Sequence, residues 1–138
     1  VLAQGLDGVL IGSRFLVCDE IQTHRAYKEH LLGCDENSTV RLLQSLGNTW
    51  RVLRNDTARQ IEAIERAGAR DHADFGELIR GSTARDHAYA LGEWQRGMLS
   101  LGPSIAFAHR IEPLRDIVRE LVDEAHASLA RISSLVST

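Results

Sequence analysis

The run GVLIG at residues 8–12 constrains the fold of this chain more than any other part of the sequence. Its apolar residues follow one another without a polar interruption, between Asp7 and Ser13. A run this short and this apolar is typical of a strand that is buried on both faces, as in the parallel sheet of an α/β protein. Because one strand cannot close a barrel, we expect the chain to be part of a larger α/β assembly.

The end of the chain predicts a long amphipathic helix. Pro113 suits a first helical turn, and the apolar residues after it recur at the three- and four-residue spacing of one helix face. They are Leu114, Ile117, Val118, Leu121, Val122, Ala125, Leu129 and Ile132. A stripe this regular has to cover a core.

Helices and one hairpin are predicted between these two ends. The expected helices span residues 23–33, 57–67, 75–80 and 83–91, and the hairpin arms are 39–44 and 50–53 around the turn 45–48. Thr23 can cap the first helix, and Gly33 offers it a left-handed stop. Asn55 and Asp56 can cap the second helix.

The composition excludes several classes of function. The 138 residues carry 16 basic and 19 acidic side chains, and no basic run stands out, so no nucleic-acid partner is expected. No apolar stretch approaches the roughly 20 residues that cross a bilayer, so no membrane partner is expected either. The sole methionine is Met98, which indicates a C-terminal piece of something longer. Without secretory features we expect a cytoplasmic protein with Cys18 and Cys34 reduced.

Short catalytic and metal-binding signatures are missing from the sequence. We find no HExxH, no cysteine pair with zinc spacing, no GxSxG, no Walker loop and no GxGxxG, so we expect no metal site. Gly12 and Ser13 are the one candidate for an anion-binding site, because glycine lets an anion approach the main chain and serine adds a hydroxyl. Turns after the last strands of (β/α)8 barrels frequently bind phosphate. A tight turn without a ligand has the same spacing.

Residues 2–32, LAQGLDGVLIGSRFLVCDEIQTHRAYKEHLL, resemble the C-terminal barrel strand and following helix of nitronate monooxygenases. The matching residues are Gly5, Asp7, Gly8, Val9, Gly12, Arg14, Phe15, Leu16, Glu20, His24, Ala26, Tyr27, Lys28, Leu31 and Leu32. Farther on, RVLRN at 51–55 resembles the family's R-x-L-R-N element, and GMLSLG at 97–102 resembles the segment before its last helix.

The resemblance implies an α/β fold, namely the C-terminal part of an FMN-binding (β/α)8 TIM barrel that is mostly helical in this segment. Residues 1–34 would hold the last barrel strand, the phosphate turn and the following helix. Residues 35–109 would be an insertion of a hairpin and short helices, and residues 110–138 the C-terminal barrel helix. Gly12 and Ser13 occupy the Gly-Thr position that holds the FMN phosphate in the family, and serine keeps the hydroxyl.

The family's catalytic histidine lies upstream of the matching segment, so no catalytic residue is assigned here and His24 is not that base. Two residues depart from the family pattern, since Pro103 replaces a glutamine and Arg110 replaces an aspartate. Both departures fall in the segment 97–111.

Several matching residues also have a structural explanation. Tyr27 and Lys28 are expected to pack rather than to bind flavin, because an aromatic ring beside a long amphipathic side chain usually covers core. Trp50 and Trp94 are expected to pack as well. Arg14 suits either a phosphate or an ion pair with its neighbours Asp19 and Glu20.

The expected function is oxidation of alkyl nitronates with O2 by an FMN-dependent nitronate monooxygenase-like enzyme, to which this chain contributes the C-terminal segment. One alternative is an FMN- and NAD(P)H-dependent enoyl-acyl-carrier-protein (enoyl-ACP) or quinone reductase of the same barrel family. A non-catalytic helical binding module is the other. Because the apolar strand and helix need a partner surface, we expect the isolated chain to form a homo-oligomer or to be poorly soluble.

Overall fold

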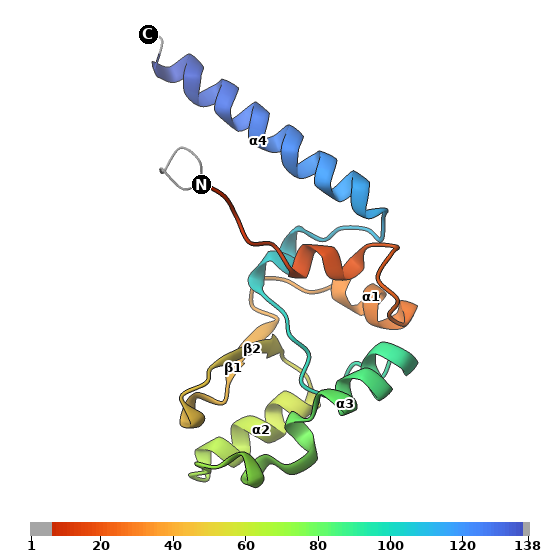
Figure 1. The fold of residues 1–138 in the computed structure, drawn as a ribbon, viewed down its shortest axis with the longest axis vertical. Helices are drawn as coiled ribbons and strands as arrows, with labels where there is room; N and C mark the ends of the chain where they lie inside the picture. Colours follow the sequence, from red (N-terminus) through yellow and green to blue (C-terminus); the bar gives the residue numbers. More distant parts are fainter. Residues whose placement is uncertain (1–6, 137–138) are drawn as a thin grey trace.

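The structure, a computed structural model, describes residues 7–136 as a mostly helical chain with one small sheet (Figure 1). The elements in order are η2 (Ser13–Val17), α1 (Arg25–Leu32), β1 (Thr39–Leu42), η3 (Gln44–Leu46), β2 (Trp50–Leu53), α2 (Asp56–Arg66), η4 (His72–Ile79), α3 (Gly81–Thr83), η5 (Ala84–Tyr89), η6 (Pro103–Phe107) and α4 (Leu114–Val136). Here η marks a 3-10 helix, except that η5 is a π-helix. No described helix is both long and apolar enough to span a bilayer.

The predicted hairpin is confirmed. Strands β1 and β2 pair antiparallel, with Thr39 opposite Leu53 and Leu42 opposite Trp50. The turn between them includes Leu43, which has a φ of 58°. Its backbone N–H donates to a carboxylate oxygen of Glu65 at 2.9 Å, and this bond holds the turn against α2.

Asn55 caps α2 as predicted. Its side-chain oxygen accepts a hydrogen bond from the backbone N–H of Ala58 at 2.8 Å. Its amide nitrogen donates to the carbonyl oxygens of Trp94 at 2.8 Å and Gly97 at 3.0 Å. Asn55 is fully buried, so one side chain both starts the helix and ties a distant loop to it.

Helix α1 begins later than predicted, and Gly33 ends it as predicted but in a different conformation. Nδ1 of His24, rather than a Thr23 oxygen, accepts the hydrogen bond from the N–H of Ala26 at 3.2 Å. Gly33 ends the helix with a φ of −90°, so its stop is not left-handed. The helix ends there with the N–H of Gly33 bonded to the carbonyl oxygen of His30 at 3.1 Å.

Two clusters of buried side chains form the core. The first joins η2, α1 and the π-helix through Val17, Tyr27, Leu31, Leu53, Ala84, Ala88, Leu99, Leu101, Ile105 and Ala108. The second lies between the hairpin, α2 and η4 and contains Leu42, Leu43, Val52, Ala58, Ile61, Phe75 and Met98. Segment 98–102 contributes to both clusters and so joins them.

Residues 7–12 form neither helix nor strand with any part of the chain that the structure describes. Val9 is 63% exposed and Leu10 is completely exposed. The predicted strand, buried on both faces, is therefore absent from this chain by itself. A parallel strand needs neighbours for its backbone N–H and C=O groups, and the only described sheet is the hairpin.

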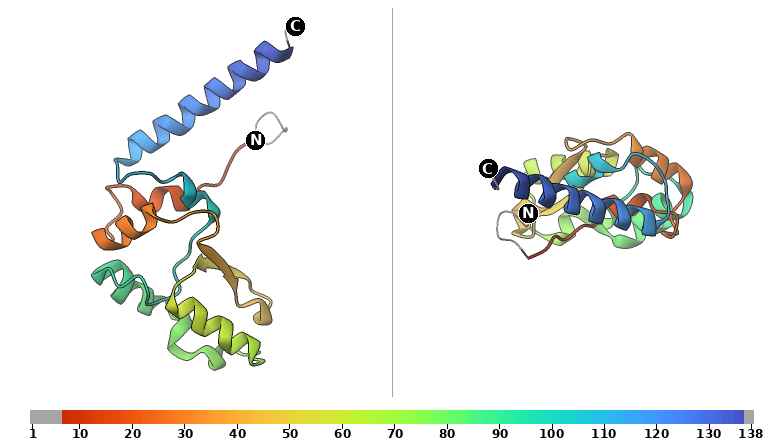
Figure 2. Two further views of the ribbon diagram at one scale, coloured as in Figure 1. Left: turned by 180° about the vertical axis from the view of Figure 1, so that it is seen from behind. Right: turned by 90° about the horizontal axis from the view of Figure 1, so that it is seen from above.

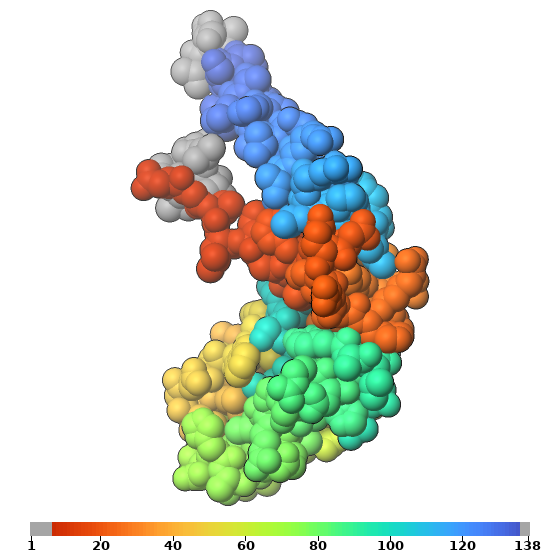
Figure 3. All heavy atoms as spheres, turned by 45° about the vertical axis from the view of Figure 1, so that its right-hand side comes forward, coloured from red at the N-terminus to blue at the C-terminus, as the bar shows by residue number. Residues whose placement is uncertain are grey.

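Helix α4 has the predicted length and stripe, but the stripe does not cover a core. Figures 1 and 2 show the helix leading away from the rest of the molecule, and Figure 3 shows it as a projecting rod. Ile117 is fully buried and Leu121 is partly buried, whereas five other stripe residues stay 36–47% exposed. These are Leu114, Val118, Val122, Leu129 and Ile132.

The exposed stripe predicts association of the isolated chain. We expect size-exclusion chromatography to show oligomers whose size grows with concentration, because large exposed apolar surfaces associate in water. The double substitution Val122→Glu with Leu129→Glu should shift the chain toward monomer. Gln60→Glu adds a charge on exposed α2 and should leave the profile unchanged. A stable monomer of the unsubstituted chain at every concentration would contradict the prediction.

Candidate functional site

Gly12 and Ser13 lie where the extended N-terminal run turns into the 3-10 helix η2. The carbonyl oxygen of Gly12 accepts from the N–H of Phe15 at 3.0 Å, which closes the first turn. Gly12 is exposed, while Ser13 is 8% exposed. The turn thus presents an open backbone at position 12 next to a buried hydroxyl.

The Ser13 hydroxyl is fixed by a residue far along the chain. Its oxygen accepts a hydrogen bond from the N–H of Gly102 at 2.6 Å. A Cβ at position 102 would lie 3.2 Å from this oxygen, so glycine there permits the close approach. Because the serine oxygen acts as acceptor in this bond, its own proton remains available for a further acceptor.

These residues line a pocket of about 330 Å³. The full lining is Gly12, Ser13, Leu16, Arg51, Ser100, Leu101 and Gly102. It contains two hydroxyls, one guanidinium and no carboxylate. No described atom lies within 4 Å of the place where a Cβ of Gly12 would be, so the backbone there is open to a ligand. This set of donors fits a phosphate group, which accepts hydrogen bonds and carries negative charge.

Gly102 and Arg51 were not predicted as members of this site. Arg51 lies on β2, and its Nη1 donates to Oγ1 of Thr39 at 2.8 Å. Both residues fall in segments that resemble the family, RVLRN and GMLSLG. That resemblance was the only signal for them in the sequence, and it gives neither residue a role.

Arg14 forms an ion pair, but with neither of its predicted partners. Its Nη2 lies 2.7 Å from Oε1 of Glu112 and 3.1 Å from Oε2 of Glu120. Arg110 reaches the other oxygen of Glu112 at 2.7 Å. Arg110, which departs from the family pattern, therefore completes a four-charge cluster at the start of α4.

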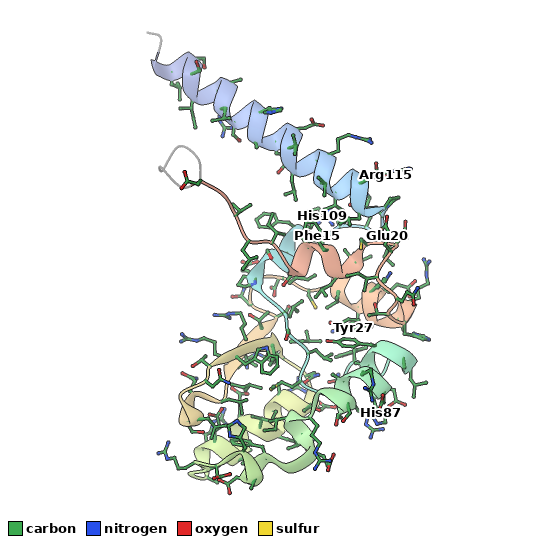
Figure 4. The ribbon with its side chains drawn as sticks, viewed as in Figure 1. Phe15, Glu20, Tyr27, His87, His109 and Arg115 are labelled. Carbon is green, nitrogen blue, oxygen red and sulfur yellow. The ribbon has the colours of Figure 1, made fainter. Side chains whose placement is uncertain are left out.

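Glu20, one of the predicted partners of Arg14, also acts at the start of α4. Its carboxylate accepts from the N–H of Leu114 at 2.8 Å, and Figure 4 shows it beside the first turn of the helix. This hydrogen bond lowers the pKa of Glu20 below its ordinary value. Anionic Glu20 therefore caps α4.

Tyr27 and Lys28 pack as predicted. The Tyr27 ring centroid lies 5.5 Å from that of Tyr89, and the side chain points from α1 toward the π-helix (Figure 4). Nζ of Lys28 donates to the carbonyl oxygen of Cys18 at 2.6 Å. Burial raises the pKa of Tyr27, which stays neutral. Both side chains hold α1 against η2 and do not line the pocket.

The two tryptophans differ in their packing. Trp94 stacks on His30 with centroids 3.4 Å apart, as expected for a packing residue. Trp50 remains 43% exposed, so the prediction that it packs in the core is wrong. Its Nε1 instead donates to Oγ of Ser100 at 2.8 Å.

The part of the chain that the structure describes contains no group of side chains arranged to hold a metal ion, and its two cysteines are not joined. No three His, Cys, Asp or Glu side chains are grouped there so that they could hold a metal ion. Cys18 and Cys34 are both free thiols, and burial raises the pKa of Cys34.

The Glu112 cluster predicts a pH dependence of stability. Burial would raise the pKa of Glu112, but hydrogen bonds from Arg14 and Arg110 outweigh it and hold the pKa below the ordinary 4.5. A carboxylate whose pKa is lowered by folding stabilises the fold above its unfolded pKa, and the contribution is lost as the pH falls through the folded value.

We therefore expect Glu112→Gln to lower the free energy of unfolding by about 1–3 kcal/mol at pH 7. The difference from the unsubstituted chain should shrink below pH 4.5 in thermal melts. Glu36→Gln, at an exposed carboxylate, should change neither. A difference between Glu112→Gln and the parent sequence that stays constant down to pH 3 would rule out the linkage.

Two solved structures resemble this fold. FabK from Thermotoga maritima matches with a TM-score of 0.81 and 27% identity over 96% of this chain and 41% of that chain. A single-residue mutant of the same FabK matches with a TM-score of 0.72 and 24% identity over 96% of this chain and 39% of that chain. The chain thus spans about two fifths of these relatives. Both are TIM barrel proteins, and this chain is a mostly helical part of such a barrel, as predicted.

The family comparison agrees with the structural one. The family model described as nitronate monooxygenase matches residues 1–124. This range includes the pocket around Gly12 and Ser13, the hairpin and the first half of α4. The chain belongs to the nitronate monooxygenase family, a family of flavin-dependent oxidoreductases.

Proposed function

We propose that this chain supplies the cofactor-phosphate site of an FMN-dependent oxidoreductase that oxidises alkyl nitronates with O2. The observation that carries the proposal is the pocket of about 330 Å³ in which the Ser13 hydroxyl, the open Gly12 backbone and one guanidinium meet without a carboxylate. Family membership supports a flavin as the ligand. When bound, the flavin accepts electrons from the substrate and passes them to dioxygen.

In this proposal the residues of the chain hold one end of the cofactor. Ser13 donates its free proton to a phosphate oxygen, and the N–H of Gly102 fixes the serine oxygen that carries this proton. Gly12 leaves room for the phosphate at the main chain. The phosphate end is remote from the reacting ring, so these residues orient the cofactor and do not themselves catalyse the reaction.

A second candidate is supported by the likeness to FabK, an enoyl-ACP reductase of the same barrel family. Such an enzyme, or a quinone reductase, would use the same phosphate site with NAD(P)H as the electron donor. A helical binding module without flavin is the remaining alternative, and it predicts that FMN does not bind. Substrate choice depends on residues outside the phosphate site.

The phosphate site is tested by Gly12→Val in the whole FMN-binding protein. Valine can adopt the φ of −123° found here, and its Cβ would meet no described atom within 4 Å beyond its chain neighbours, so the fold should survive. Its side chain would occupy the space proposed for the phosphate, and we expect the FMN retained after purification to fall by about tenfold or more. The matched control is Gly81→Val, at an exposed glycine whose Cβ position also has no atom within 4 Å and which lies outside both the strand and the pocket. Unchanged FMN content in Gly12→Val would reject the site.

The reaction is tested by oxygen uptake with propionate 3-nitronate and added FMN. We expect turnover by the whole FMN-loaded protein and none above the free-flavin background by the 138-residue chain, which supplies only the phosphate site. Turnover by the isolated chain would show that it needs no further part of the barrel. If the FMN-loaded protein does not turn over nitronates but oxidises NAD(P)H in the presence of an enoyl thioester, the protein is instead a reductase.

A further inference from the structure

We propose that Arg51 neutralises the phosphate held beside Gly12 and Ser13, and that hairpin β1–β2 is therefore part of the cofactor site. The inference rests on the proposed function in taking the anion to be the phosphate monoester of FMN. It adds a residue from the insertion 35–109, far from the strand and turn that first suggested the site.

The position of Arg51 carries the first step. It lines the same pocket as Gly12 and Ser13 and is the only charged residue in that lining. A phosphate monoester carries close to two negative charges at neutral pH, and glycine backbones with hydroxyls supply hydrogen bonds but no full positive charge. A guanidinium suits this role, because its planar set of N–H donors matches phosphate oxygens.

The bonding of Arg51 carries the second step. Within residues 7–136 it forms no ion pair with a carboxylate, whereas Arg14, Arg54 and Arg110 all do. Its Nη1 donates to Oγ1 of Thr39 at 2.8 Å. Thr39 is a neutral acceptor that orients the guanidinium and leaves its charge uncompensated, and the remaining N–H groups can donate to an anion.

The neighbour of Arg51 across the hairpin is a second arginine that does not line the pocket of Gly12 and Ser13. Arg41 lies directly opposite Arg51 in the register of β1 and β2. Like charges at directly opposite positions destabilise a strand pair. Arg41 lines a different pocket, toward the turn and α2, so the two guanidinium groups diverge.

A short hydrogen-bonded path fixes Arg51 relative to Ser13. The N–H of Leu101 donates to the carbonyl oxygen of Arg51 at 3.3 Å, and the N–H of the next residue, Gly102, donates to Oγ of Ser13 at 2.6 Å. The N–H of Leu53 donates to the carbonyl oxygen of Leu99 at 2.8 Å and holds the same strand and segment together. The strand that carries Arg51 and the Ser13 hydroxyl are therefore held together before a ligand arrives, and the Thr39 bond orients the guanidinium, which lowers the entropic cost of binding.

The experiment titrates the isotopically labelled 138-residue chain, carrying Val122→Glu and Leu129→Glu to keep it monomeric, with inorganic phosphate, FMN and riboflavin, and follows backbone and Arg51 Nε–H signals by NMR. Phosphate and FMN should shift the amides of Ser13 and Gly102 together with Arg51 Nε–H, and riboflavin, which has no phosphate, should not. Arg51→Met should weaken binding of phosphate and FMN by about tenfold or more. Arg51→Lys, which keeps the charge, should fall in between. Arg41→Met, which removes the opposite guanidinium, is the matched control and should bind as the chain that keeps Arg41 does.

The outcomes separate this inference from the proposed function. If phosphate and FMN shift Ser13 and Gly102 but Arg51→Met binds as tightly as before, the phosphate site stands and the role of Arg51 is overturned. If neither ligand shifts Ser13 and Gly102 in the chain that keeps Arg51, the phosphate site is overturned as well. The Arg51 Nε–H signal needs no substitution at Arg51, so a variant that fails to fold leaves the decision to that signal.

Discussion

The fold depends on how the chain segment 97–102 is held at both ends. At one end the N–H of Gly97 donates to Oγ1 of Thr57, and Gly97 has a φ of 98° in a place where a Cβ would lie 2.6 Å from Ala84. At the other end the N–H of Gly102 donates to Ser13. Between these ends, Met98 belongs to the second core cluster, Leu99 and Leu101 belong to the first, and Ser100 is exposed. Because glycine is required at the first end and favoured at the second, this one segment sets the spacing between the core and the pocket.

The parts that the sequence predicted are those with local signals. The hairpin follows from its turn residues, and the cap of α2 follows from Asn55 just before a helical pattern. Gly12 and Ser13 were proposed from a turn after an apolar run and from the family resemblance, and their role as a phosphate site stays a prediction. Gly102 was not found, since its contact with Ser13 joins residues 89 positions apart and no local pattern encodes such a pair.

The exposure of two apolar segments has one cause. Residues 8–12 and the stripe of α4 carry the patterns of buried elements, yet both are exposed here. An amphipathic pattern indicates that an apolar face is covered, but it does not indicate which surface covers that face. The chain spans 41% of FabK from Thermotoga maritima, whose fold it shares, so the surfaces that cover such elements in a barrel belong to other parts of the relative. The sequence indicated that both segments need a partner surface, and their exposure here agrees with that expectation; it did not indicate that residues 8–12 would form no strand without the partner.

The charge cluster of Arg14, Arg110, Glu112 and Glu120 has a mechanical consequence for α4. The helix has 23 residues and is therefore about 35 Å long. The helix is attached to the rest of the chain at its first turns, by this cluster, the Glu20 cap and buried Ile117. A tilt of about 10° at these first turns would displace the C-terminal end of the helix by about 6 Å. The position of the last turns of α4 therefore depends on the four charges at the start of the helix, and on little else along its length.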